Sequence, residues 1–239
     1  MKYRWITPDR EGRADFTVLE YWIEANDRIW QEAREKAQEL AKQMNVHSPS
    51  GEVRDPKMIL ANCFAGCIAE NAIIFRLNSY AGESGKAVRA RPTLFDKSKD
   101  NDQVDILVSN EERPEMPGVS IEVRSSYGAV QDNYKRYTQW FSIVGNYVSA
   151  NKARELVKDF YITVVFNFSQ DIMYQKMVSG ELIPLQLAAG CSREFLEKYG
   201  RIDSLKNKGA KYLVIKPLIK GLPVDAVMDQ IFERLEIRR

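Results

Sequence analysis

Hydrophobic side chains recur at helical spacing through residues 17–45. They include Trp22, Ile29, Trp30 and Leu40, with alanines between them. A repeat of three or four residues places such side chains on one face of a helix. The pattern therefore predicts one long amphipathic helix over 17–45.

A second helix is indicated from Asp55, because an aspartate followed by Pro56 is typical of an N-cap with proline at the first helical position. The sequence from there to about Leu77 is apolar on almost every side, which predicts a buried helix. Glu70 lies inside this apolar run, and a buried acid is costly unless it is paired. We expect Gly66, one turn earlier, to let the helix approach the sheet beside that acid.

Short runs rich in β-branched and aromatic residues predict strands in the rest of the chain. A strand over residues 87–96 contains Pro92, which favours a sheet edge or a bulge. The other predicted strands cover residues 104–109, 119–125, 160–168 and 211–217.

Predicted helices surround these strands. A polar, aromatic helix is expected over residues 131–157, a helix and loop over 169–209, and a last helix over 223–236. Helices that precede, interrupt and follow strands are typical of an α/β fold with a central mixed β-sheet flanked by helices. A length of 239 residues favours a single large domain, residues 1–239.

The strands predicted at 104–109 and 119–125 form a hairpin with charged side chains on one face. Because side chains alternate along a strand, Glu122 and Arg124 share a face, and the apolar residues of the strand take the other: Val119, Ile121 and Val123. In the first strand, Asp105 likewise lies on the face opposite to that of Val104, Ile106 and Val108. The pattern predicts one face that packs on the core and one that carries these three charged residues.

Two carboxylates on adjacent strands are able to converge on a hard divalent cation. Mg²⁺ is held by one or two carboxylates together with water and substrate phosphate oxygens. It polarises a phosphodiester and lowers the pKa of a bound water. The alternative is a solvent-facing hairpin on which Glu122 and Arg124 form an ion pair worth about 0.2–1 kcal/mol.

These residues resemble the signature of the PD-(D/E)XK nuclease superfamily, an aspartate followed on the next strand by Glu-x-Lys. Here Asp105 is followed, after sixteen intervening residues, by Glu122-x-Arg124. The resemblance covers about residues 57–168, and it implies a mixed sheet flanked by helices with the acidic pair on a hairpin. It also implies a further acid on the preceding helix, where Glu70 stands.

The resemblance implies a Mg²⁺-dependent DNA endonuclease, with Mn²⁺ as a substitute metal, and a type II restriction enzyme is the class that we expect. Asp105, Glu122 and Glu70 would bind the metal and act in catalysis. Arg124 stands where the motif has lysine, and arginine does not give up its proton. It would therefore hold the scissile phosphate and orient the attacking water.

The arginine at position 124 leaves two alternatives open. Lys135, on the following predicted helix, could supply the missing ammonium. Alternatively the site is inactive, and the chain is a non-catalytic nucleic-acid-binding or assembly protein on the same fold. An α/β scaffold unrelated to nucleases is a third interpretation of the whole pattern.

Charge is distributed unevenly although the net charge is only +2. Residues 102–122 contain six acids and one arginine, whereas residues 201–220 contain six lysines and arginines and one aspartate. Phosphate contacts supply much of the affinity for DNA, so a basic segment suits a DNA enzyme. A solvated loop and strand account for the same lysines equally well. The predicted DNA contacts are Ser125, Ser126, Gln131, Asn133, Lys135 and Arg136.

Three cysteines and one histidine in a chain of this length favour a reducing compartment. Buried free thiols are expected rather than a zinc site built from Cys63, Cys67, Cys191 and His47. The first residues lack an apolar signal core, and no run of about 18 apolar residues is present. We therefore expect a cytoplasmic protein with no membrane partner.

The resemblance also suggests an organisation for the whole chain. Residues 57–168 would form the nuclease-like core, with the helix at 17–45 and the region 169–239 as elaborations. Cutting both strands of a duplex calls for two active sites, so a homodimer is expected. The helices at 17–45 or 223–236 would form its interface.

Overall fold

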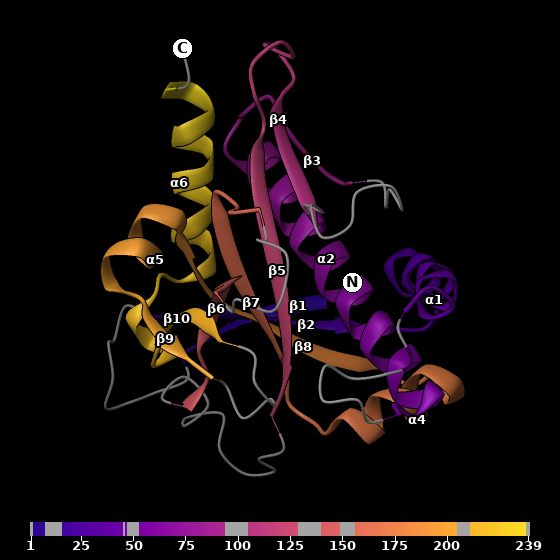
Figure 1. The fold of residues 1–239 in the computed structure, drawn as a ribbon. Helices are drawn as coiled ribbons and strands as arrows, with labels where there is room; N and C mark the ends of the chain where they lie inside the picture. Colours follow the sequence, from indigo (N-terminus) through magenta and orange to yellow (C-terminus); the bar gives the residue numbers. More distant parts are fainter. Residues whose placement is uncertain are drawn as a thin grey trace.

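The computed structural model describes residues 2–7, 16–44, 46, 53–93, 105–128, 140–148, 156–204 and 211–237. The central element is a seven-stranded mixed sheet (Figure 1). Its strands, in spatial order, are β1 (Lys2–Ile6), β2 (Val18–Ile23), β8 (Ile183–Ser192), β7 (Phe160–Phe166), β5 (Val119–Tyr127), β4 (Ile106–Asn110) and β3 (Val88–Pro92).

Neighbouring strands of this sheet are antiparallel, except β5 and β7, which run parallel. The predicted α/β fold with a central mixed sheet flanked by helices is therefore confirmed. Pro92 lies in β3, the strand at one end of the order, as expected for a residue that cannot donate a ladder hydrogen bond.

Four helices pack against one face of the sheet: α1 (Arg28–Ala41), α2 (Pro56–Glu83), α4 (Gln170–Ser179) and α6 (Val224–Ile237). Alternate residues of β7, such as Phe160 and Ile162, point into this core together with Ile106 and Ile121 of the hairpin. The same face therefore buries the apolar side of the predicted hairpin.

The opposite face is covered by a second, three-stranded sheet of β6 (Ile143–Tyr147), β10 (Tyr212–Ile215) and β9 (Arg201–Asp203). A short helix, α5 (Arg193–Tyr199), and a 3₁₀ turn at Leu218–Lys220 complete this layer. The buried residues here include Tyr161 and Cys191 of the main sheet and Ile143 of the small one. The hairpin face that carries Glu122 is the face of Tyr161, because the two residues are paired across β5 and β7.

Helix α2 begins as the sequence predicts. The Asp55 side chain accepts a hydrogen bond from the Lys57 backbone N–H at 2.9 Å, and Pro56 is the first helical residue. The helix ends at Glu83, beyond the expected end near Leu77. By length and composition it could cross a membrane, but its buried residues are part of the core shared with the sheet and with α1.

The single helix expected over residues 17–45 is wrong in its first part. Val18–Ile23 form strand β2, which pairs with β1 on one side and β8 on the other, and the helix begins only at Arg28. Every residue of β2 except one is fully buried. Burial on both faces removes the polar–apolar alternation that marks a strand, so the helical spacing of neighbouring apolar residues dominated the pattern.

Two further expected helical regions contain strands. Within 131–157, residues 131–139 and 149–155 lie outside the described part of the chain, and β6 occupies the middle. Within 169–209, helix α4 is followed by the ten-residue strand β8. The three cysteines are free, as expected, and His47 lies outside the described residues.

Candidate active site

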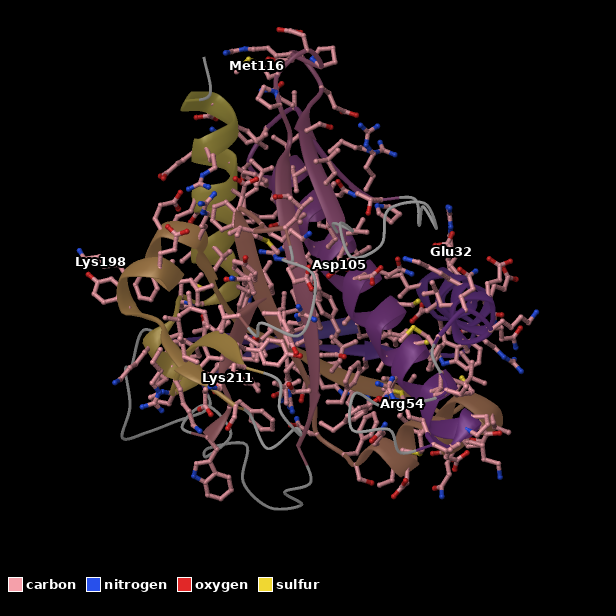
Figure 2. All side chains as sticks on the ribbon, viewed as in Figure 1. Glu32, Arg54, Asp105, Met116, Lys198 and Lys211 are labelled. Carbon is pink, nitrogen blue, oxygen red and sulfur yellow. The ribbon has the colours of Figure 1, made fainter. Side chains whose placement is uncertain are left out.

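The candidate site lies where strands β4 and β5 separate. Their last paired residues are Ile106 and Ile121, so Asp105 directly precedes the last paired residue of β4 and Glu122 directly follows that of β5. Strand β5 continues to Tyr127 along β7, whereas β4 begins at Ile106. The two acids therefore lie at the open end of the hairpin, where the two strands separate, and Figure 2 shows Asp105 there, beside β5.

Asp105 is anchored to the neighbouring strand by its side chain. Its Oδ2 accepts a hydrogen bond from the Val123 backbone N–H at 2.7 Å. Burial raises the pKa of Asp105, although this hydrogen bond and the charges of Arg124, Lys158 and Lys36 act in the opposite direction. The carboxylate is thus held in a place where its negative charge depends on nearby cations.

Glu122 and Arg124 share a face of β5, as predicted, and form an ion pair. The Arg124 Nη2 lies 2.9 Å from the Glu122 Oε1. The Glu122 side chain is only 8% exposed, whereas that of Arg124 is 31% exposed. The expected Glu122–Arg124 pair therefore exists, but its acid is buried rather than solvated.

Glu70 of helix α2 is paired with Lys36 of helix α1, whose Nζ donates to the Glu70 Oε2 at 2.7 Å. Burial raises the pKa of Glu70, Lys36 lowers it, and the nearby charge of Asp105 raises it again. The predicted acid of the apolar helix is thus mostly buried, paired, and close enough to Asp105 for the two carboxylates to repel each other.

The pKa of Lys36 is raised as well, which favours the charged form of this lysine. Burial disfavours its charged form, but the attraction of Glu70 and the hydrogen bond between them outweigh burial and raise the pKa of Lys36. Lys36 was not identified from the sequence. It stands beside Ala33 and Ala37, which are buried against α2, so a helical projection of α1 would have placed it at the border of the buried face.

The acids are not gathered into a ready metal site. Within the described ranges, no group of three or more His, Cys, Asp or Glu side chains is arranged to hold an ion. Mg²⁺, however, requires only one or two carboxylates, its other ligands being water and substrate oxygens. Asp105 and Glu122 supply two carboxylates next to the last paired residues of the hairpin, so the donor types fit this ion.

The predicted role of Gly66 is wrong. A Cβ atom added at Gly66 would meet nothing within 4 Å, so the sheet does not require a glycine at this point of α2. A glycine is needed instead at Gly190 of β8, where an added Cβ would lie 2.6 Å from the Tyr161 carbonyl oxygen.

Most of the predicted DNA contacts fall outside the described residues. Ser125 and Ser126 lie half-buried on β5 directly after Arg124. Gln131, Asn133, Lys135 and Arg136 belong to the segment that the structure does not describe. In the basic segment 201–220, the described Arg201, Lys211 and Lys220 are exposed, and Lys216 is paired with Asp203 at 3.5 Å.

Comparison with known proteins finds a relative but no function. No protein-family model matches the chain, and no solved structure matches it. The sequence is 26% identical to the uncharacterized protein MJECS01 of Methanocaldococcus jannaschii, over 94% of this chain and 88% of that protein. The chain is therefore similar to that archaeal protein along nearly its whole length.

Proposed function

We propose that this chain is a Mg²⁺-dependent DNA endonuclease of the PD-(D/E)XK type, and that it acts as a type II restriction enzyme. The observation that supports the proposal is that Asp105 and Glu122 both lie next to Ile106 and Ile121, the last paired residues at the open end of the hairpin. Glu70, on the preceding helix, lies close enough to Asp105 for the charge of that carboxylate to raise the pKa of Glu70.

Asp105 and Glu122 would hold the ion, with Glu70 as an accessory ligand or as the group that positions a water. When bound, Mg²⁺ or Mn²⁺ would polarise the phosphodiester and supply a water of lowered pKa. The side chains of the site would bind the scissile phosphate and orient the attacking water.

Arg124 has two partners in this proposal. Without substrate its guanidinium neutralises Glu122. With substrate it turns to the oxygens of the scissile phosphate, which it is suited to bind in bidentate fashion. The same movement releases Glu122 for the ion, so phosphate binding and metal binding assist each other.

A plasmid-nicking assay with Mg²⁺ or Mn²⁺ tests the proposal. We expect the wild type to cleave, Glu122→Ala to lose about 10²-fold or more of the rate through loss of transition-state charge stabilisation, and Glu111→Ala to cleave normally. Glu111 is a matched control, because it is an exposed acid at the far end of the same hairpin. Lack of metal-dependent cleavage by the wild type on linear, supercoiled and branched DNA would contradict the proposal.

Substitutions of Arg124 separate its proposed role from that of Lys135. If the guanidinium acts through its charge, Arg124→Lys keeps most of the activity and Arg124→Ala loses it. If Lys135 supplies the ammonium, Arg124→Ala is tolerated and Lys135→Ala is inactive. Single-turnover cleavage rates at saturating protein distinguish the two results.

A specific observation favours the alternative, a non-catalytic nucleic-acid-binding or assembly protein. Both Glu122 and Glu70 are already paired with protein cations, and the described residues form no ready metal group. This alternative predicts DNA binding without metal, equal affinity for wild type and Glu122→Ala, and no cleavage by either. Fluorescence anisotropy with labelled duplex, run beside the nicking assay, distinguishes the two functions.

We also propose a cytoplasmic homodimer, because two cuts in a duplex call for two sites. The apolar face of α6 is used within the chain, since Val227, Ile231 and Leu235 are buried in the core. Of the two segments expected to form the interface, the outer face of α1 thus remains the better candidate. Light scattering of the purified protein measures the mass directly.

A further inference from the structure

Lys158 is a buried lysine. Its side chain is among the largest fully buried ones of the described residues, and the residue is only 2% exposed. Its Nζ has no hydrogen-bond partner within the described part of the chain. A buried ammonium costs several kcal/mol unless an anion or a set of acceptors compensates it. Such a group calls for a physical reason, and Lys158 has no role in the function proposed above.

The position of Lys158 relates it to the candidate site. Its backbone N–H donates to the Tyr161 hydroxyl at 3.1 Å. Tyr161 is paired with Glu122 across β5 and β7, so both point to the same face of the sheet. The backbone of Lys158 therefore lies beside Tyr161, the residue that pairs with Glu122.

The chain next to Lys158 is fixed in place. The Asp159 Oδ2 accepts hydrogen bonds from the Ser120 backbone N–H and from the Ser120 hydroxyl, both at 2.8 Å, and the Asp159 N–H donates to the same hydroxyl at 3.0 Å. Arg234 adds an ion pair to the Asp159 Oδ1 at 3.3 Å. These contacts attach the start of β7 to β5 two residues before Glu122, so the backbone that carries Lys158 has little freedom to move it away.

The charges of three cations lower the pKa of Asp105, and two of these cations form ion pairs with other carboxylates. Arg124 is 2.9 Å from Glu122, and Lys36 is 2.7 Å from Glu70. The third is Lys158, whose charge favours the ionised form of Asp105. A phosphate brings further negative charge to a site that already holds three carboxylates. Among these three cations of the described residues, Lys158 is the one with no hydrogen-bond partner to give up when the phosphate arrives.

We propose that Lys158 is a positioning residue of this site, whose buried and unpartnered side chain next to Tyr161 offsets the charge of an incoming nucleic-acid phosphate. The inference rests on the proposed endonuclease function. It assigns this role to a residue two positions before β7 begins.

The test compares Lys158→Met with Lys158→Arg and with Lys42→Met, an exposed lysine at the end of α1 as a matched control. Methionine keeps the shape of the side chain and removes its charge. We expect kcat for plasmid cleavage to fall about 10²–10³-fold, in the range for loss of one electrostatic stabiliser, while KM changes little. Lys158→Arg should recover part of the rate, and Lys42→Met should match the wild type.

Thermal unfolding gives a second readout that does not depend on activity. A charge held in the interior for function is a stability cost, and its replacement by an apolar side chain is often stabilising. We expect Lys158→Met to raise Tm by about 2–4 °C. A purely structural lysine predicts the opposite, a lower Tm with activity lost in proportion to the folded fraction.

The outcomes separate the two proposals. Cleavage by the wild type together with full activity of Lys158→Met overturns the role of Lys158 and leaves the endonuclease proposal standing. A fall in Tm of Lys158→Met with an unchanged kcat per folded molecule overturns it as well. Failure of the wild type to cleave removes the endonuclease function and, with it, this inference.

Discussion

At the scale of single residues, two of the three acids of the candidate site form ion pairs with protein cations. Glu70 is matched by Lys36, and Glu122 by Arg124, at hydrogen-bonding distance. Asp105 lies between the two pairs and takes its hydrogen bond from the backbone. This arrangement lets three carboxylates coexist in a partly buried place, where unmatched charges would be costly.

The Glu70–Lys36 pair predicts a pH-dependent stability. The pKa of Glu70 is raised in the folded state, so the folded protein binds the Glu70 proton more tightly than the unfolded chain does. Ionising Glu70 therefore lowers the stability of the fold as the pH rises above the ordinary pKa of a glutamate. Lys36 limits that loss. Lys36→Met should therefore destabilise the protein by about 1–2 kcal/mol at pH 8, and by less as the pH falls toward the raised pKa of Glu70, for example at pH 5.

Urea unfolding at the two pH values measures this difference. Arg28→Met is the matched control, because Arg28 forms an exposed pair with Glu32 on the same helix, and such pairs contribute little. An equal loss of stability at pH 5 and pH 8 for Lys36→Met would show that Lys36 acts through packing rather than through its charge.

At the scale of elements, two glycines make opposite demands. Gly66 lies inside α2, where an added methyl group would meet no atom within 4 Å. Gly190 lies in β8, where the same group would approach the Tyr161 carbonyl oxygen and Val227. The effect of a substitution at Gly66 is therefore set by helix propensity, and the effect at Gly190 by the close approach of the neighbouring backbone.

We expect Gly66→Ala to stabilise the protein by about 0.5–1 kcal/mol, because alanine loses less conformational freedom in a helix than glycine does. Gly190→Ala should destabilise it by about 1–3 kcal/mol through overpacking of a central strand. Thermal or urea unfolding of the two variants side by side provides the measurement. Destabilisation by Gly66→Ala would mean that a further neighbour occupies that face of α2.

The elements also show what can be predicted from the sequence. The hairpin was predicted because its signal is local: alternation puts Ile106 and Ile121 on the core side and Glu122 on the other. Strand β2 was missed because its pairing with β8 is decided far along the chain. Strand β8 itself is rich in leucine, alanine and glycine, which carry little strand preference.

The same distinction holds for the site. Glu122 and Arg124 are close in the sequence pattern, and their shared face could be derived from it. Lys36 and Lys158 enter from an N-terminal helix and from the start of β7. Lysine is among the residues that are least often buried, so no property of its sequence neighbourhood indicates the burial of Lys158.

At the scale of the whole molecule, the fold rests on one large core and one smaller one on the two faces of the sheet. Arg76 of α2 fastens the outer helix α6 to this body through Asp225, with its Nη2 2.7 Å from the Asp225 Oδ2. The stability of the fold therefore derives from apolar burial and internal ion pairs of the described residues.

Metal removal should accordingly leave the fold intact. In the described ranges the acids are matched by protein cations and form no ready metal group, so EDTA should not change Tm. Millimolar Mg²⁺ should raise Tm only by mass action, whereas cleavage, under the proposed function, should be abolished by EDTA and restored by added Mg²⁺ or Mn²⁺. Differential scanning fluorimetry and the nicking assay measure the two effects. A large fall of Tm in EDTA would reveal a structural ion.

The pairing of β2 with β8 sets an order for the synthesis of this chain. Ile23 pairs with Ile183, 160 residues further along, so the N-terminal strands leave the ribosome long before their partner exists. At about 5–20 residues per second this interval lasts roughly 8–30 s. During it, the aromatic and branched side chains of β2 have no sheet to join. Ribosome-bound chains that end before residue 183 should therefore expose their N-terminal strands to proteases and chaperones, and chains that extend beyond residue 192 should protect them.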